Sequence, residues 1–170
     1  MTDARWGEYR EARDAMEAGI RDKATGWVGR LKERELVIAG AVAYWCEGSK
    51  SKPWREQPVL EFINSDPGLI EIFLRFVEAM GADRRRLTYR LSIHESADAS
   101  AAGRWWAERI GIDVADMRRP TIKKHKPTGN RRNKGDEYRG CLVITVPRSR
   151  RLYVRVEGLM AGIFASLAPR

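Results

Sequence analysis

The 170-residue sequence is poor in the side chains that build metal centres and covalent active sites. It contains only two cysteines and two histidines, and neither histidine has a cysteine or histidine partner at the spacing of zinc ligands. A glycine-rich phosphate loop and a nucleophile elbow are missing as well. These absences argue against a zinc protein and against an enzyme that acts on small molecules, and we expect no small-molecule cofactor.

Long apolar runs are also missing. The longest, LVIAGAVAYWC, is shorter than the roughly 20 residues of a membrane-spanning helix, and the polar N-terminal segment does not resemble a signal peptide. Cys46 and Cys141 lie far apart in the sequence, and nothing requires a disulfide between them, although one is possible. We therefore expect reduced thiols, no membrane partner and a cytoplasmic protein.

Acidic residues are scarce in one part of the chain. Residues 117–155 contain thirteen Lys and Arg but only two acids, Asp136 and Glu137, an excess of +11 against +9 for the whole sequence. The basicity therefore belongs to one region, and such a field attracts a polyanion. The alternative is a solvated basic surface without a partner.

Hydrophobic periodicity divides the sequence into alternating helices and strands. We predict helices over residues 4–22, 34–46, 67–80, 97–110 and 150–167. We predict a hairpin of roughly 48–54 and 58–64, followed by strands over 86–95, 118–126 and 141–146. This order favours an α+β fold in which helices cover one face of a sheet and basic strands line the other, wet face.

Two helices have informative ends or faces. Asp66 is a helix N-cap, Pro67 takes the first helical position and Gly81 closes the far end. The helix over 34–46 carries a run of small side chains around Gly40, which suggests that another backbone approaches it closely. Because Gly26 and Gly29 interrupt the preceding segment, residues 1–33 are expected to be a helical appendage and 34–170 the main domain.

Four segments, YWCEGSKSKPW, NSDP, IHESAD and YRGCLVI, together with the order of elements, make residues 34–165 resemble the LAGLIDADG homing endonucleases and their DNA-binding relatives. The resemblance is closest to a bacterial group with one motif per chain. It implies a LAGLIDADG-like saddle, a mixed or antiparallel sheet with helices packed on one face and a basic face in the DNA major groove. It also implies a homodimer, whose motif helices would pack through Ala39, Gly40, Ala43 and Tyr44.

The resemblance assigns a metal ligand. In that family the acid before the final glycine of the motif helix binds a divalent metal at the scissile phosphate, and here that acid is Glu47, followed by Gly48. A carboxylate suits Mg²⁺, which would support phosphodiester hydrolysis with Glu47 and Lys50 as catalytic residues. Because a helix C-terminus disfavours an anion, Glu47 needs a cation, either the metal or a salt bridge to Lys50 or Lys52.

Basic residues around a turn-rich segment and on the strands are expected to contact DNA, since arginine reads guanine edges and lysine neutralises phosphates. The expected contacts are Lys52, Arg90, Lys123, Lys124, His125, Lys126, Arg131, Arg132, Lys134 and Arg139. His94 either contacts DNA or metal, or serves as an outer-shell base; the alternative is that it caps the next helix or packs at the end of its strand. Of Trp105 and Trp106, one is expected in the core, and stacking on single-stranded bases is the alternative.

The sequence therefore predicts a protein that binds double-stranded DNA, with Mg²⁺-dependent cleavage through Glu47 as the first hypothesis. The second hypothesis is a transcriptional regulator of the same fold that does not cleave. A third, from another class, is a basic RNA-binding or protein-interaction module.

Overall fold

The computed structural model describes residues 2–57, 59–124 and 138–168, and the chain divides into two compact units, Met1–Lys32 and Glu33–Arg170. The boundary expected after residue 33 lies one residue from this division. The expected contacts His125, Lys126, Arg131, Arg132 and Lys134 lie outside the described residues.

The first unit contains one helix, α1, over Thr2–Val28. The expected end at residue 22 is wrong, because the helix continues through Gly26 and stops at Gly29, whose φ is +54°. An interior glycine costs a helix only about 1 kcal/mol against alanine, whereas a left-handed glycine ends the hydrogen-bonded ladder. Large apolar side chains are exposed along this helix, among them Trp6, Tyr9, Met16, Ile20 and Trp27.

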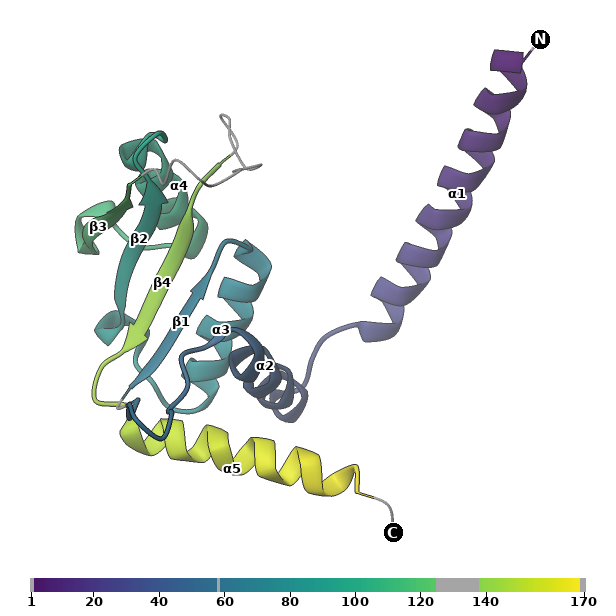
Figure 1. Ribbon diagram of the computed structural model, residues 1–170. Helices are drawn as coiled ribbons and strands as arrows, with labels where there is room; N and C mark the ends of the chain where they lie inside the picture. The colour runs from purple at the N-terminus through teal and green to yellow at the C-terminus, as the bar shows by residue number, and fades with distance from the viewer. Residues whose placement is uncertain (1, 58, 125–137, 169–170) are drawn as a thin grey trace. The chain divides into compact units, whose positions relative to one another are not determined.

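The second unit is built on a four-stranded mixed sheet within the described residues, in the order β1-β4-β2-β3. The strands are β1 (Leu60–Asn64), β2 (Thr88–His94), β3 (Met117–Lys123) and β4 (Cys141–Val146). β4 is antiparallel to both β1 and β2, and β3 is parallel to β2. Figure 1 shows the strands side by side, with α3 next to β1 and α5 across their lower end.

The predicted hairpin is half wrong. Its second strand exists as β1, but β1 pairs with β4 from the far end of the chain. The segment after α2 contributes only isolated bridges, Gly48 to Phe62 and Lys52 to Arg55. Pro53 lacks the N–H that a ladder position requires, so this segment forms a loop.

The remaining helices follow the predicted order: α2 (Glu33–Glu47), α3 (Pro67–Ala79), α4 (Ala99–Ile110) and α5 (Arg150–Ser166). Two short 3₁₀ helices, Arg84–Arg86 and Val114–Asp116, precede β2 and β3. The predicted cap of α3 is confirmed, because the Asp66 carboxylate accepts from Gly68 N at 2.7 Å and Leu69 N at 3.0 Å. Gly111 closes α4 at a φ of +69°.

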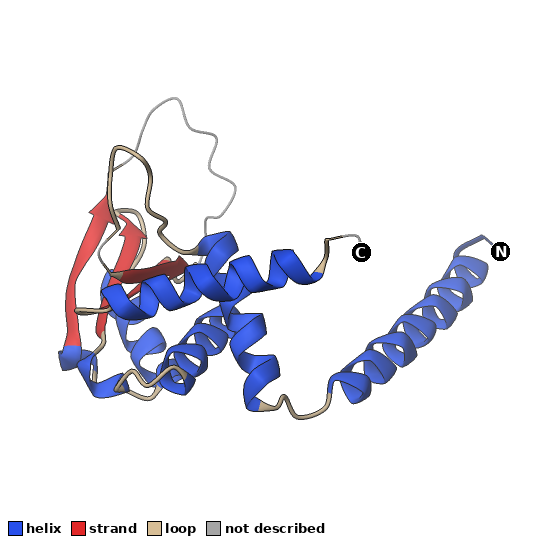
Figure 2. Cartoon of the chain, turned by 90° about the horizontal axis from the view of Figure 1, so that it is seen from below, coloured by secondary structure: helices blue, strands red, loops and turns tan. Residues whose placement is uncertain are grey.

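One hydrophobic core lies between the helices and one face of the sheet. Phe62 of β1 stacks on Phe73 of α3 at 4.6 Å between ring centroids. Trp106 of α4 is fully buried and its indole N–H donates to the Arg139 carbonyl at 2.8 Å, so it is the core tryptophan of the pair with Trp105. Figure 2 shows the strands on one side and the helices of this unit on the other. The predicted α+β class is confirmed.

The close backbone approach expected from the small residues of α2 occurs within the chain. A Cβ added at Gly40 would overlap the ring of Phe76 in α3. Gly40 and Tyr44, two of the four residues expected at a dimer interface, are buried in this way in the chain's own core, while Ala39 and Ala43 are half-buried.

Candidate nucleic-acid interface

The face of the sheet turned away from the core carries every second residue of each strand. The strand register places Arg90 of β2 between Val143 of β4 and Arg118 of β3, and places His94 beside Lys123. Val143 is buried although it lies on this face, so the exposed groups surround it. We call this surface, with Arg90, Arg118 and Lys123 as its cations, the open face.

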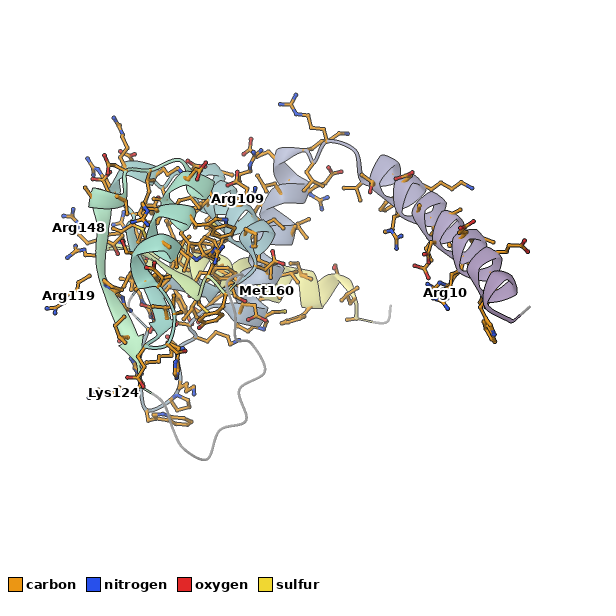
Figure 3. The ribbon with its side chains drawn as sticks, turned by 90° about the horizontal axis from the view of Figure 1, so that it is seen from above. Arg10, Arg109, Arg119, Lys124, Arg148 and Met160 are labelled. Atoms are coloured by element: carbon orange, nitrogen blue, oxygen red, sulfur yellow. The ribbon has the colours of Figure 1, made fainter. Side chains whose placement is uncertain are left out.

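The β2–β3 edge of the open face is its basic side. The Arg90 guanidinium donates to the Thr121 hydroxyl at 2.5 Å, which ties the two strands together. The register shifts between Arg90 and Ser92, at the point where β3 contains Arg119 and Pro120. Figure 3 shows Arg119 and Lys124 projecting away from the core at this edge. A polyanion on the open face would therefore meet cations from both strands.

The opposite edge of the open face carries an acid. Glu61 of β1 lies opposite Thr145 of β4. Its carboxylate accepts from the Ser49 hydroxyl at 3.2 Å and from the Thr145 hydroxyl at 3.4 Å. These two hydroxyls fix the orientation of the carboxylate before any ligand arrives.

Glu47, the expected metal ligand, is the last residue of α2 and is exposed. The salt bridge weighed as its alternative role does not form. The Lys50 ammonium instead donates to the Trp45 carbonyl at 2.5 Å, and the Lys52 ammonium lies 5.6 Å from the centroid of the Trp54 ring. Among the described residues the Glu47 carboxylate makes no ion pair; Lys50, the cation bound at this helix end, contacts a backbone carbonyl and not the carboxylate.

The donor set at Glu47 is small. Within the described ranges no three His, Cys, Asp or Glu residues come together as a metal site. Mg²⁺ needs only one or two carboxylates when phosphate oxygens and water complete its shell. One unpaired carboxylate per chain therefore fits a magnesium ion held jointly with a substrate phosphate, and does not fit a cage made by this chain alone.

The loop after α2 is held by two tyrosines. The Tyr44 hydroxyl donates to the Ser49 carbonyl at 2.6 Å, and the Ser51 N–H donates to the Tyr153 hydroxyl at 2.7 Å. Burial raises the pKa of the Tyr44 phenol well above its usual value, so it remains a neutral donor. A Cβ at Gly48 would lie 2.7 Å from the Tyr44 carbonyl oxygen, so only glycine fits at the start of the loop.

The residues that the sequence predicts to contact DNA lie in separate parts of the structure. Arg90 and Lys123 lie on the β2–β3 pair and Lys124 directly follows β3, whereas Lys52 lies in the loop after α2. Arg139 is half-buried beside α4, where its carbonyl accepts from Trp106.

The helix-capping role weighed for His94 is wrong, because Asp98 is the N-cap of α4 and its side chain accepts from the Ala101 N–H. The alternative position fits, since His94 is the half-buried last residue of β2. Its Nδ1 accepts from the Ser96 N–H at 3.2 Å, in the turn before α4.

Sequence reasoning missed residues that alternation and helix spacing could have found. Glu61 alternates with the buried Leu60 and Phe62, which places it on the open face. Ile38, Val42 and Cys46, spaced by four along α2, lie on the helix face turned away from Gly40; Val42 is 39% exposed.

Comparisons of the chain with protein-family models, with curated proteins and with solved structures found no match. In the described part of the chain no helix is both long and apolar enough to cross a membrane.

Proposed function

We propose that the second unit, Glu33–Arg170, binds double-stranded DNA on the open face, in the manner of the saddle of LAGLIDADG proteins. The observation that carries the proposal is the register of β2 and β3, which brings Arg90, Arg118 and Lys123 onto the sheet face turned away from the core. Cations on a twisted sheet can follow a groove and neutralise phosphates on both sides of it. The helix α4, which contains Trp105 and Trp106, is an insertion relative to the simplest LAGLIDADG pattern.

The proposed assembly is a homodimer on a pseudo-palindromic site. The outer face of α2 supports it, since Ile38, Val42 and Cys46 form a partly exposed apolar stripe beside the core-facing Gly40. Two copies that pair through this stripe would bring both helix ends, and hence both Glu47 carboxylates, to one dyad axis.

For the cleavage hypothesis, Glu47 of each copy would hold Mg²⁺ together with a DNA phosphate. The metal would supply Lewis-acid stabilisation of charge on the phosphoryl oxygens. The chain's own part is to present the carboxylate at the end of α2, which the close packing of Gly48 on Tyr44 holds in place. Lys50 is bound to the helix end through Trp45, so in this state its ammonium stabilises the helix terminus.

A regulator that binds without cleaving is the second candidate. It is supported by the position of Gly40, which packs on Phe76 of the same chain. The outer face of α2 then presents Val42, a branched side chain that keeps two helices further apart than glycine would. The two Glu47 carboxylates would be correspondingly further apart.

Selection of bound duplexes from a random pool, followed by gels with and without Mg²⁺, tests both candidates. A recovered palindrome supports the dimer, and product bands that disappear in Glu47→Gln while binding persists support the nuclease. Intact DNA with the native protein in both Mg²⁺ and Mn²⁺ supports the regulator. If RNA competes better than duplex DNA at equal salt, the DNA-binding proposal is wrong.

A further inference from the structure

We propose that the groove beside the C-terminal end of α2 binds a single DNA nucleotide whose base is unpaired, with the base stacked on Trp54. The groove has a volume of about 420 Å³, and its walls include Lys50, Lys52, Trp54, Arg55, Gln57 and Glu61. The inference takes its ligand class from the proposed function, but it concerns a different surface from the basic edge of the open face.

The walls of the groove are fixed by hydrogen bonds within the loop. Lys52 and Arg55 exchange backbone hydrogen bonds at 2.9 and 3.0 Å, which makes a tight turn with Trp54 at its tip. The Gln57 N–H donates to the Ser51 hydroxyl at 2.8 Å, and Ser51 is in turn bound to Tyr153 of α5. A ligand would therefore enter a site that is already ordered, which lowers the entropic cost of binding.

Three cations surround the groove without acidic partners. Lys50, Lys52 and Arg55 are exposed, and within the described residues none of them forms an ion pair. Lysine and arginine around a concave site are the recurring means of holding a nucleic-acid backbone. Glu56 is not an internal counterion for them, because it pairs with Arg150 at 2.9 Å.

Trp54 supplies the stacking surface. Its side chain is 79% exposed. A single exposed apolar residue needs no explanation, but this indole lines the groove, and the Lys52 ammonium lies 5.6 Å from its ring centroid. Aromatic rings are recurring platforms for unpaired bases, and stacking tolerates any base. A base inside an intact duplex is already covered by its neighbours on both sides, so Trp54 can stack only on an unpaired one.

Glu61 gives the groove a direction and a base preference. Its carboxylate, oriented by the Ser49 and Thr145 hydroxyls, repels phosphate and accepts hydrogen bonds from an amino group. The phosphate therefore belongs at the lysines and the base edge at Glu61. Cytosine carries an exocyclic amino group and thymine does not, so we expect cytosine to bind more tightly than thymine.

The test compares three duplexes of equal length and at equal salt: fully paired, with one unpaired cytosine, and with one unpaired thymine. The native chain is expected to bind the unpaired-cytosine duplex most tightly. Trp54→Ala should weaken that complex about tenfold, a typical loss for one stacked base, with Trp54→Phe retaining part of it. Trp27→Ala is the matched control, because Trp27 is also exposed (89%) and lies in α1. Glu61→Gln should remove the preference for cytosine over thymine.

The outcomes separate this inference from the proposed function. If the paired duplex binds but an unpaired base adds nothing, or if Trp54→Ala and Trp27→Ala behave alike, the groove proposal is overturned and duplex binding stands. If the paired duplex is ignored while unpaired bases bind through Trp54, the groove proposal stands and the proposed function fails. Because Trp54 and Trp27 are both exposed, Trp54→Ala and Trp27→Ala should each unfold at the same temperature as the native chain, as measured by circular dichroism.

Discussion

The backbone of Gly40 lies directly against the aromatic ring of Phe76, and this contact fixes the crossing of α2 and α3. It also decides which face of α2 remains for a partner. The small residues that suggested helix pairing between two chains are used first for helix pairing within one. The face left outside carries Val42, and the proposed dimer has to be built on it.

Gly40→Ala is expected to destabilise the protein by about 1–3 kcal/mol, since the added methyl group overlaps Phe76 and the core must shift. Gly158→Ala is the matched control. It lies in α5 with open space around its Cα, so alanine should stabilise by up to about 1 kcal/mol through helix propensity. Chemical denaturation measures both. Equal effects of the two substitutions would contradict the close α2–α3 crossing.

Ser149→Ala tests a buried bridge between β1 and β4. The Ser149 hydroxyl donates to the Val146 carbonyl at 2.6 Å and accepts from the Leu60 N–H at 2.7 Å. Its loss leaves a buried N–H without a partner, and we expect a cost of about 1–3 kcal/mol. Ser166→Ala, which removes an exposed hydroxyl bound to Ile163, should change the free energy of unfolding by less than about 0.5 kcal/mol.

Arg90→Ala and Lys123→Ala test the open face. If each side chain contacts a phosphate, each substitution should lower the log–log salt slope of duplex binding by about 0.9. Arg75→Ala removes the same charge from α3, where Arg75 pairs with Glu71 at 2.7 Å, and should leave the slope unchanged. Fluorescence anisotropy at several salt concentrations gives the slopes. An equal change in all three variants would mean that only net charge matters.

Asp98 makes stability depend on pH. Its carboxylate accepts from the Ala101 N–H at 2.9 Å at the start of α4, and this hydrogen bond lowers the pKa of Asp98 below its usual value. Because its folded-state pKa is lowered, the Asp98 carboxylate stabilises the fold at pH values above its unfolded-state pKa of about 3.9. That stabilisation is lost as the pH falls through the folded-state pKa. Asp98→Asn keeps a cap that does not titrate, so its stability deficit should shrink as pH falls from about 6 to 3. A deficit independent of pH would contradict the role of the charge.

Removal of residues 1–32 tests the division into units. The hydrophobic core lies entirely within Glu33–Arg170, so the shortened chain should keep its thermal midpoint and its duplex affinity. Circular dichroism and anisotropy measure these two quantities. A lowered thermal midpoint of the shortened chain would show that α1 stabilises the second unit.

Much of the secondary structure was readable from local signals. The Asp66 cap with Pro67, and the apolar run over Cys141–Val146 bounded by Gly140 and Pro147, each depend on neighbours a few residues away. The hairpin at 48–54 was not readable, because β1 has two possible partners and the sequence does not say which is nearer in space. The better one is β4, whose Ile144 packs opposite Phe62 although the two are far apart in the sequence.

The sequence predicted which residue types form the candidate site but not how they are arranged, and their role in binding DNA stays a prediction. Local composition indicated a basic surface, and the resemblance pointed to Glu47. The separation of Lys52 from Arg90, the burial of Gly40 and the grouping of Trp54 with Glu61 follow from how the loop after α2 folds over β1.

Composition and spacing alone determined that this chain is an α+β protein with a concentrated positive charge, because caps, periodicity and charge act locally. Only the tertiary structure decided which cations share a face and which glycine meets an aromatic ring. Strand register and helix crossings are set by the packing of segments that lie far apart in the sequence. Which of the possible pairings wins is decided only when the whole core forms.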